Sequence, residues 1–406
     1  MASVVDQLGA VLAVTPSTAS PRFFNQLFAG RDGAALLADA LASMLNNSMY
    51  TYKAAGVHVL IELELVRRMG ALMGFDNPEG VFTPGGSLSN LCGMMLARNE
   101  AVEGFNDRGS QGRVLRVYSS SDSHYSIRKA AAVLGVGRDN VVPVAVDSRG
   151  RMDPIALDSA IRADIEAGHL PIMINATSGT TVLGAFDPLD ALADVADAHG
   201  LWLHVDGAYG ASMIFHPDFA DHFKGIERAD SVVWDAHKMM GVPLTCSVIL
   251  VRNKGLLTKH MSEAATYLFQ DDTDLLNPGT RSLQCGRRND ALKLWTAWKR
   301  HGDVGYRSRM KTMRSLSLYA REAVVAHPDL ELVREPESVN LCFRVSGVDA
   351  DTLCTELHRR GKLMVGHAFI DKVAVVRPAF VNPDATRSDI DVFFAEVHSV
   401  AESMRA

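Results

Sequence analysis

The sequence predicts an α/β protein: a mostly parallel central sheet with helices on both faces, followed by a small C-terminal α+β domain. From residue 114 to residue 251, short apolar segments alternate with segments of helical periodicity, and this order is typical of a parallel sheet covered on both sides. After residue 326 short strand-like segments alternate with helical ones again. A chain of 406 residues suits one large and one smaller domain. We therefore expect an arm over residues 1–55, a large domain over residues 56–305 and a small domain over residues 306–406.

The N-terminal segment is predicted to be an arm that packs against a neighbouring molecule. Pro16 and Pro21 interrupt its start, one helix is expected near residues 34–44, and the segment is too short for a core of its own. A partly disordered tail would account only for residues 1–15.

The first strong helical pattern covers Val57 to Met73, where apolar residues recur every three or four positions. The next predicted helix extends through Arg98 and opens on Gly85, Gly86 and Ser87. Backbone N–H groups and the positive dipole at such a helix start suit a phosphate. Most glycine turns of this kind are only turns, so the motif by itself is weak.

The alternating part of the chain then predicts its elements in order. Strands are expected at residues 114–119, 141–146, 172–176, 201–205 and 231–234. Helices are expected at residues 126–134, 155–167 and 189–199, the last ending at Gly200. Residues 270–282 are polar and rich in turn formers, which predicts a mobile surface loop. Helices at 290–300, 306–326, 350–360 and 388–404 and strands at 341–345 and 373–377 complete the expected elements.

Two predicted strands end on residues that can do chemistry. Asp206 follows the apolar run at 201–205, and Lys238 comes shortly after the run at 231–234. The carboxyl ends of parallel strands form the edge where α/β sheets bind ligands. A carboxylate beside a lysine suits pyridoxal phosphate (PLP), since the lysine forms a Schiff base and the acid keeps the pyridine nitrogen protonated. The spacing leaves open the alternative that Asp206 caps a turn and Lys238 is a surface lysine.

Composition disfavours several other classes of protein. The net charge of −6 and the absence of a Lys/Arg cluster argue against nucleic acid as a partner. The sequence has neither an apolar run of about 18 residues nor a signal peptide, which argues against a membrane protein. Five cysteines without a CxxC pair predict reduced thiols in a cytoplasmic protein, and 14 histidines without HExxH spacing predict no metal site.

Eight segments in order carry a family resemblance. They are PRFFNQLFAG (21–30), TPGGSLSNLCGMMLAR (83–98), SHYSIRKAAAVLGVG (123–137), NATSGTTVLGAFDPL (175–189), LWLHVDGAYG (201–210), HKMMGVPLTCSVILV (237–251), YLFQ (267–270) and QCGRRNDALKLW (284–295). The chain resembles the group II PLP-dependent amino acid decarboxylases, and within them is similar to the glutamate and cysteine sulfinate decarboxylase branch. The resemblance implies the PLP-dependent transferase fold (fold type I) and a homodimer whose active sites are shared between subunits.

The resemblance also implies a cofactor site. Lys238 would form the Schiff base, Asp206 would pair with the pyridine nitrogen, and His124 would stack on the ring. The set expected to bind PLP comprises Gly86, Ser87, His124, Thr177, Asp206, Ala208, His237 and Lys238. Of these, Ser87, the nearby backbone amides and His237 would hold the phosphate, while Ala208 and Thr177 would lie beside the ring.

On the substrate side, Arg377 in the segment VAVVRPAFVNP (373–383) would bind the α-carboxylate, because its planar fork binds a carboxylate bidentately. A surface arginine at a strand end is the alternative. Phe24, Gln26 and Asn47 are expected to contact the substrate. The branch implies a small acidic L-amino acid: aspartate, glutamate, cysteine sulfinate or cysteate.

One feature departs from the family pattern. Its loop between YLFQ and QCGR usually carries a tyrosine that protonates Cα, and here residues 271–283 contain none. Decarboxylation to the amine would then use another proton donor, such as Lys238 or His124. The alternative is diversion to oxidative deamination or transamination. An aminotransferase or lyase of the same fold and a non-catalytic PLP-binding protein are two further readings, which the quoted segments and the intact site residues disfavour.

Overall fold

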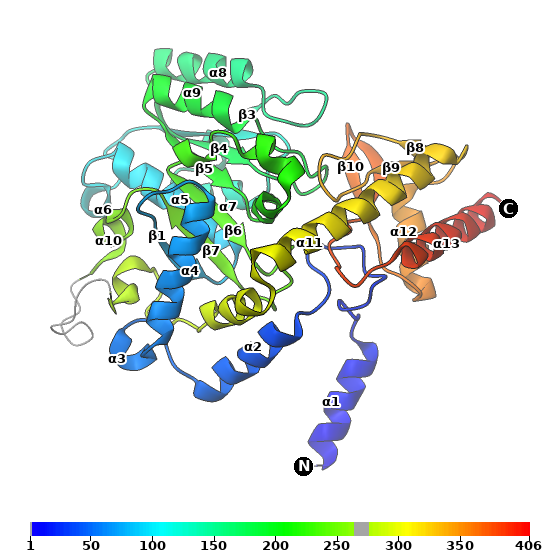
Figure 1. Ribbon diagram of the computed structural model, residues 1–406. Coiled ribbons are helices and arrows are strands. Elements are labelled where there is room, and N and C mark those ends of the chain that lie inside the picture. Colours follow the sequence, from blue (N-terminus) through cyan, green and yellow to red (C-terminus); the bar gives the residue numbers. More distant parts are fainter. Residues whose placement is uncertain (1, 264–275) are drawn as a thin grey trace.

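The structure is a computed structural model that describes residues 2–263 and 276–406. Among these residues a seven-stranded sheet has the order β1-β7-β6-β5-β4-β2-β3 (Figure 1). Its strands are β1 (Glu79–Thr83), β2 (Leu115–Ser120), β3 (Val141–Val144), β4 (Leu170–Thr177), β5 (Trp202–Asp206), β6 (Ser231–Asp235) and β7 (Ser247–Val251). Strands β2 to β6 are parallel, whereas β7 runs antiparallel to β6 and β1. The predicted fold class is confirmed, although the expected strands included neither β1 nor β7.

Helices cover both faces of this sheet, because alternate residues of each strand point to opposite sides. In β6, Val232 and Trp234 belong to one apolar core and Val233 belongs to the other. The first face packs against α4 (His58–Leu72), α8 (Pro154–Glu166), α9 (Leu189–His199) and α11 (Ala291–Ala326). The second face packs against α5 (Gly86–Ala101), α7 (Ser126–Val133) and α10 (Leu256–Met261), with α6 (Phe105–Arg108) following α5.

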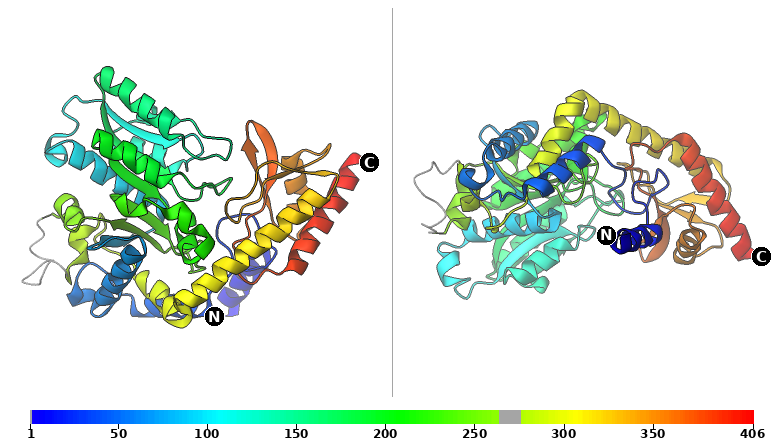
Figure 2. Two further views of the ribbon diagram at one scale, coloured as in Figure 1. Left: turned by 45° about the horizontal axis from the view of Figure 1, so that its top comes forward. Right: turned by 90° about the horizontal axis from the view of Figure 1, so that it is seen from below.

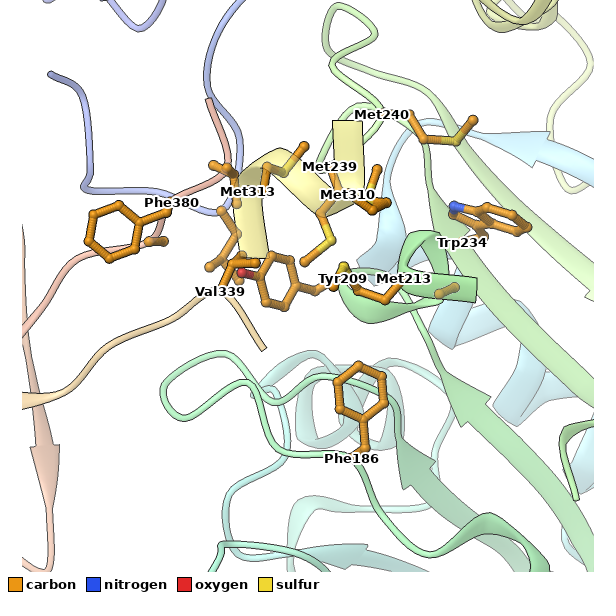
Figure 3. Packing of buried hydrophobic residues seen from close by; sticks show 14 of the residues in the cluster. Phe186, Tyr209, Met213, Trp234, Met239, Met240, Met310, Met313, Val339 and Phe380 are labelled. Carbon is orange, nitrogen blue, oxygen red and sulfur yellow. The ribbon is translucent and has the colours of Figure 1, made fainter. Parts of the chain in front are cut away.

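Helix α11 joins the large sheet to the C-terminal part of the chain. Met310 and Met313 of this helix lie between Trp234 on one side and Phe380 on the other (Figure 3). Two helices were predicted here, at 290–300 and 306–326. The structure confirms a break between them, because α11 is interrupted at Gly302, whose φ of 61° and ψ of −176° are not helical.

The C-terminal part contains a four-stranded antiparallel sheet of order β10-β11-β9-β8 within the described residues. Its elements are β8 (Leu330–Leu332), β9 (Phe343–Val345), α12 (Ala350–Arg360), β10 (Gly366–Ile370), β11 (Val373–Arg377) and α13 (Arg387–Arg405). Figure 2 shows this sheet and α13 beside the far end of α11. The small C-terminal α+β unit is thus confirmed.

The N-terminal segment forms three helices within the described residues: α1 (Ala2–Val14), α2 (Gly33–Leu45) and α3 (Tyr52–Ala55). Residues 2–14 are therefore helical and not a disordered tail. In Figure 1, α1 extends from the body of the molecule, and Val5 and Leu12 on it are exposed. Helix α2 packs against α11, through Ala38, Ala42 and Leu292.

A mobile loop was predicted at residues 270–282. Its first part, up to residue 275, lies outside the described residues, as does the YLFQ segment (267–270). For residues 276–282 the prediction is wrong. Pro278 and Thr280 are buried, and the N–H of Gly279 donates to the carbonyl of Tyr50 at 2.8 Å. Polar composition indicated exposure here, but this stretch packs against the N-terminal segment. Among the described residues, no helix combines the length and apolar character needed to cross a membrane.

Candidate active site

The carboxyl ends of three parallel strands and the start of α5 enclose a cavity of about 210 Å³. Thr177, Asp206 and Asp235 are the last residues of β4, β5 and β6. The cavity is lined by Gly86, Ser87, Asn90, His124, Thr177, Gly179, Thr181, Asp206, Ala208, Tyr209, Asp235, His237 and Lys238. All eight residues predicted to bind the cofactor are therefore brought together. This edge of the sheet is where α/β folds bind ligands.

Asp206 is held at both carboxylate oxygens. Its Oδ2 accepts a hydrogen bond from Asn90 Nδ2 at 2.8 Å, and its Oδ1 accepts one from the N–H of Ala208 at 3.1 Å. The turn-capping alternative is thus partly right, since one oxygen does cap the turn. The side chain nevertheless lines the cavity with a defined orientation, and each oxygen keeps a lone pair for a ligand N–H.

Asn90 organises the centre of the site, and the sequence analysis did not single it out. Its Nδ2 also donates to Ser126 Oγ at 2.9 Å, and its Oδ1 lies 3.0 Å from His204 Nε2. Complete burial lowers the pKa of His204 to about 4, so this ring is neutral near pH 7. The one available signal was position: Asn90 lies in the first turns of the helix that follows the glycine turn.

Lys238 enters the cavity from the turn after β6, with 22% of its side chain exposed. Its Nζ lies 3.5 Å from Asp235 Oδ2. The next two residues, Met239 and Met240, are completely buried in the core and anchor this turn (Figure 3). The surface-lysine alternative is therefore disfavoured.

His124 lies at the same cavity, and its Nδ1 is 2.8 Å from Ser126 Oγ. Burial lowers the pKa of His124, an effect that the nearby Asp206 carboxylate partly opposes. A neutral, flat ring beside the cavity is suited to stacking on an aromatic ligand.

The start of α5 is shaped for close approach of a ligand. A Cβ atom on Gly86 would lie 2.6 Å from Asp235 Oδ2 and 3.2 Å from Ala208 Cβ, so a side chain would not fit there. In the described part of the chain, Thr177 Oγ1 and Asp235 Oδ1 are buried without a hydrogen-bond partner. Buried polar atoms are normally paired, so these residues fit a polar ligand such as PLP.

Arg377 ends β11 in the C-terminal sheet and is not among the described residues that line the cavity. Its Nε and Nη1 are buried, and no described residue is their hydrogen-bond partner. Burial lowers the pKa of Arg377, whereas Tyr209 raises it. Tyr209 lines the cavity and donates its hydroxyl hydrogen to Asn340 Oδ1 at 2.5 Å. Tyr209 therefore connects the cavity with the surroundings of Arg377.

The three other residues predicted to contact substrate are not among the described cavity-lining residues. Phe24 is 1% exposed and packs its ring 5.5 Å from Phe380 and 5.4 Å from Phe393. Gln26 is exposed, and Asn47 is half-buried. Their contact with substrate stays a prediction.

Known proteins resemble this chain over nearly its whole length. Residues 2–346 match the model of the pyridoxal-dependent decarboxylase conserved domain. Cysteine sulfinic acid decarboxylase of Rattus norvegicus is 39% identical over 425 aligned residues, covering 99% of this chain and 86% of that relative. Acidic amino acid decarboxylase of Mus musculus is 38% identical over 417, covering 97% and 76%. The crystal structure of mouse CSAD matches with a TM-score of 0.94 and 38% identity, covering 98% of this chain and 87% of that one.

Proposed function

The chain belongs to the pyridoxal-dependent decarboxylase family, which makes it a PLP-dependent amino acid decarboxylase, and we propose that its substrate is a small L-amino acid with an acidic side chain. Aspartate, glutamate, cysteine sulfinate and cysteate are the candidates. The support is that the relatives are named for cysteine sulfinic acid and for acidic amino acids. The products are then the corresponding amine and carbon dioxide.

The observation that carries the mechanism is the doubly held Asp206 in one cavity with Lys238. Bound PLP supplies an electron sink for the pair released from the Cα–carboxyl bond. Lys238 Nζ would attach the cofactor, and Asp206 would keep a proton on its pyridine nitrogen. Asn90 maintains the orientation of Asp206 through its 2.8 Å hydrogen bond.

The other cavity residues orient the cofactor. His124 would stack on the cofactor ring, and Ala208 and Thr177 would lie beside it. Gly86, Ser87 and His237 hold the phosphate at the positive end of α5. The close approach at Gly86 and Thr177 Oγ1, for which no described residue is a hydrogen-bond partner, support these roles.

Arg377 would bind the α-carboxylate of the substrate and so fix the orientation of the bond to be broken. Its buried guanidinium atoms, unpartnered among the described residues, support this role, since a carboxylate would satisfy them in a bidentate pair. Phe24, Gln26 and Asn47 complete the substrate site.

The proton that returns to Cα would come from Lys238 Nζ, which lies in the same cavity. His124 is less suited, because burial lowers its pKa and Ser126 engages its Nδ1. This role for Lys238 compensates for the missing loop tyrosine.

The assembly is a homodimer with shared active sites, to which the arm at residues 1–55 contributes. Exposed apolar residues on α1, including Val5 and Leu12, support a packing role for this arm. The chain divides into this arm, a large domain over residues 56–305 and a small domain over residues 306–406.

All five cysteines are free thiols, which supports a cytoplasmic location.

The experiment is incubation of the PLP-loaded enzyme with each of the four acids in deuterated water. Mass spectrometry then measures carbon dioxide, amine and aldehyde. We expect the amine with one deuterium at the former α-carbon. Aldehyde or keto product would support the diverted reaction, and no carbon dioxide from any acid would refute the substrate class. Lys238→Ala, which removes the attachment point, is the inactive control.

A further inference from the structure

A second carboxylate, that of Asp235, lies in the cofactor cavity. Asp235 is 2% exposed, and its Oδ2 is 3.5 Å from both Lys238 Nζ and His237 Nε2. No described residue is a hydrogen-bond partner of its buried Oδ1, whereas both oxygens of Asp206 accept hydrogen bonds. An unsatisfied buried acceptor is unfavourable, and more so if it is charged. A bound ligand that donates a hydrogen bond would remove this cost.

The Asp235 carboxylate lies against the start of α5. A Cβ atom on Gly86 would be 2.6 Å from its Oδ2 and 3.1 Å from its Oδ1. This is the helix end to which we assign the cofactor phosphate. A phosphate monoester carries about −1.5 to −2 charges at pH 7, with a second pKa near 6. Two anions are thus brought together at one helix terminus, and because the Asp235 carboxylate is buried, their repulsion is screened less than that between two exposed charges.

The neighbouring groups do not neutralise both anions. Burial lowers the pKa of His237, so its ring is neutral near pH 7. Lys238 loses its pairing with Asp235 when its nitrogen bonds the cofactor. The ammonium of Lys293 is engaged by Asp290 at 2.7 Å.

The remaining titratable groups around the carboxylate add no positive charge. Burial lowers the pKa of His124, which also interacts with the charges of Asp206 and Asp235. Burial raises the pKa of the Cys246 thiol, so it stays uncharged. Asp206 is assigned to the protonated pyridine nitrogen, so that pair leaves no positive charge over for Asp235 and the phosphate.

We propose that Asp235 and the cofactor phosphate share one proton, so that PLP binds with one negative charge fewer than the two separate anions carry. The proton comes from solvent and lies in an O–H···O bond between the carboxylate and a phosphate oxygen, which gives Oδ1 its partner. PLP loading therefore takes up a proton. This inference rests on the proposed phosphate site and concerns cofactor binding, not the reaction.

The test compares cofactor affinities of wild type, Asp235→Asn and a control, Asp221→Asn, between pH 6 and pH 9. Asp221 carries the same charge but its side chain is 84% exposed and paired with Lys224 at the surface. Cofactor-free enzyme is titrated with PLP and with pyridoxal, which lacks the phosphate, and binding is read from absorbance. Schiff-base formation has its own pH dependence, which Asp235→Asn alters because Asp235 lies 3.5 Å from Lys238 Nζ; the pyridoxal titration measures this contribution separately.

For PLP, we expect the affinity of Asp235→Asn divided by that of wild type to rise about tenfold per pH unit above the second pKa of the phosphate. The reason is that wild type takes up one proton when it binds PLP, whereas the variant does not. For pyridoxal the ratio changes with pH much less than for PLP, because only the effect on Lys238 remains, and Asp221→Asn shows no change with either ligand. A PLP ratio independent of pH, or the same change with pyridoxal, would overturn the proposal. Failure of wild type to bind PLP at all would instead refute the proposed function.

A second measurement needs no substitution. The ³¹P chemical shift of PLP bound to wild type should remain that of a phosphate sharing a proton well above pH 6, where free PLP has become the dianion. A bound resonance at the dianion position throughout this range would refute the shared proton, even if Asp235→Asn did not fold.

Discussion

Replacing Asn90 with alanine tests whether one side chain of α5 organises the active site. Asn90 is 1% exposed, and alanine removes its hydrogen bonds to Asp206 at 2.8 Å and Ser126 at 2.9 Å. It also removes the 3.0 Å contact with His204 Nε2. A hydrogen bond to a charged group contributes about 1.5–3 kcal/mol and a neutral one about 0.5–1.5 kcal/mol. We expect the free energy of unfolding to fall by about 3 kcal/mol or more.

Loss of the hydrogen bond between Asn90 and Asp206 should also weaken PLP binding, because the carboxylate loses its fixed orientation. A loss of about 1.5–3 kcal/mol corresponds to about 10- to 100-fold in the dissociation constant. Urea unfolding of cofactor-free enzyme and titration with PLP measure the two effects separately.

Asn99→Ala is the matched control on the same helix. Asn99 is 5% exposed, donates to Asn106 Oδ1 at 2.8 Å and accepts from Arg98 Nε at 3.1 Å. It should lower the unfolding free energy by about 1–3 kcal/mol without changing PLP affinity. Unchanged PLP binding by Asn90→Ala, or an equal loss in both variants, would contradict the reasoning.

Three further predictions concern the substrate site, the buried histidine and the start of α5. Arg377→Lys should lower kcat/KM about 10- to 100-fold, because a bidentate carboxylate pair is lost, while PLP affinity is unchanged; steady-state kinetics with unaltered kcat/KM would contradict this. The pKa of His204 is lowered to about 4, below about 6.5 in the unfolded chain, so the unfolded state binds the extra proton between these values. The free energy of unfolding should therefore fall by up to about 3 kcal/mol as pH falls from 6.5 to 4. When it is measured by urea unfolding at several pH values, the unfolding free energy of His204→Asn should depend less on pH in this window than that of wild type. Gly86→Ala should weaken PLP binding at least about tenfold in a titration, since its Cβ would meet Asp235 Oδ2 at 2.6 Å, whereas Gly9→Ala, with open surroundings, should bind PLP like wild type.

Local patterns were sufficient to predict most of the architecture. Helix α9 was expected at residues 189–199 and α12 at 350–360, and both have these bounds. Periodicity reports which face of an element is buried, and a glycine such as Gly200, with φ of 65°, ends a helix because it adopts the left-handed conformation readily. The positions of Asp206 and Lys238 followed from the same patterns, since the ends of parallel strands meet at one edge. The quoted segments were sufficient to recognise the family, which the comparisons confirm.

The partners of the site residues depend on packing between distant parts of the chain. Asn90 and Asp206 are 116 positions apart, and Tyr209 and Asn340 are 131 apart, so no local pattern predicts that they meet. The same holds for Gly279, whose hydrogen bond to Tyr50 joins a polar stretch to the N-terminal segment. Asp235 is the clearest case: the sequence places it at a strand end, but its unsatisfied oxygen exists only because α5 packs against β6 there. Hydrogen-bond satisfaction is a property of the assembled three-dimensional environment, which local periodicity does not encode.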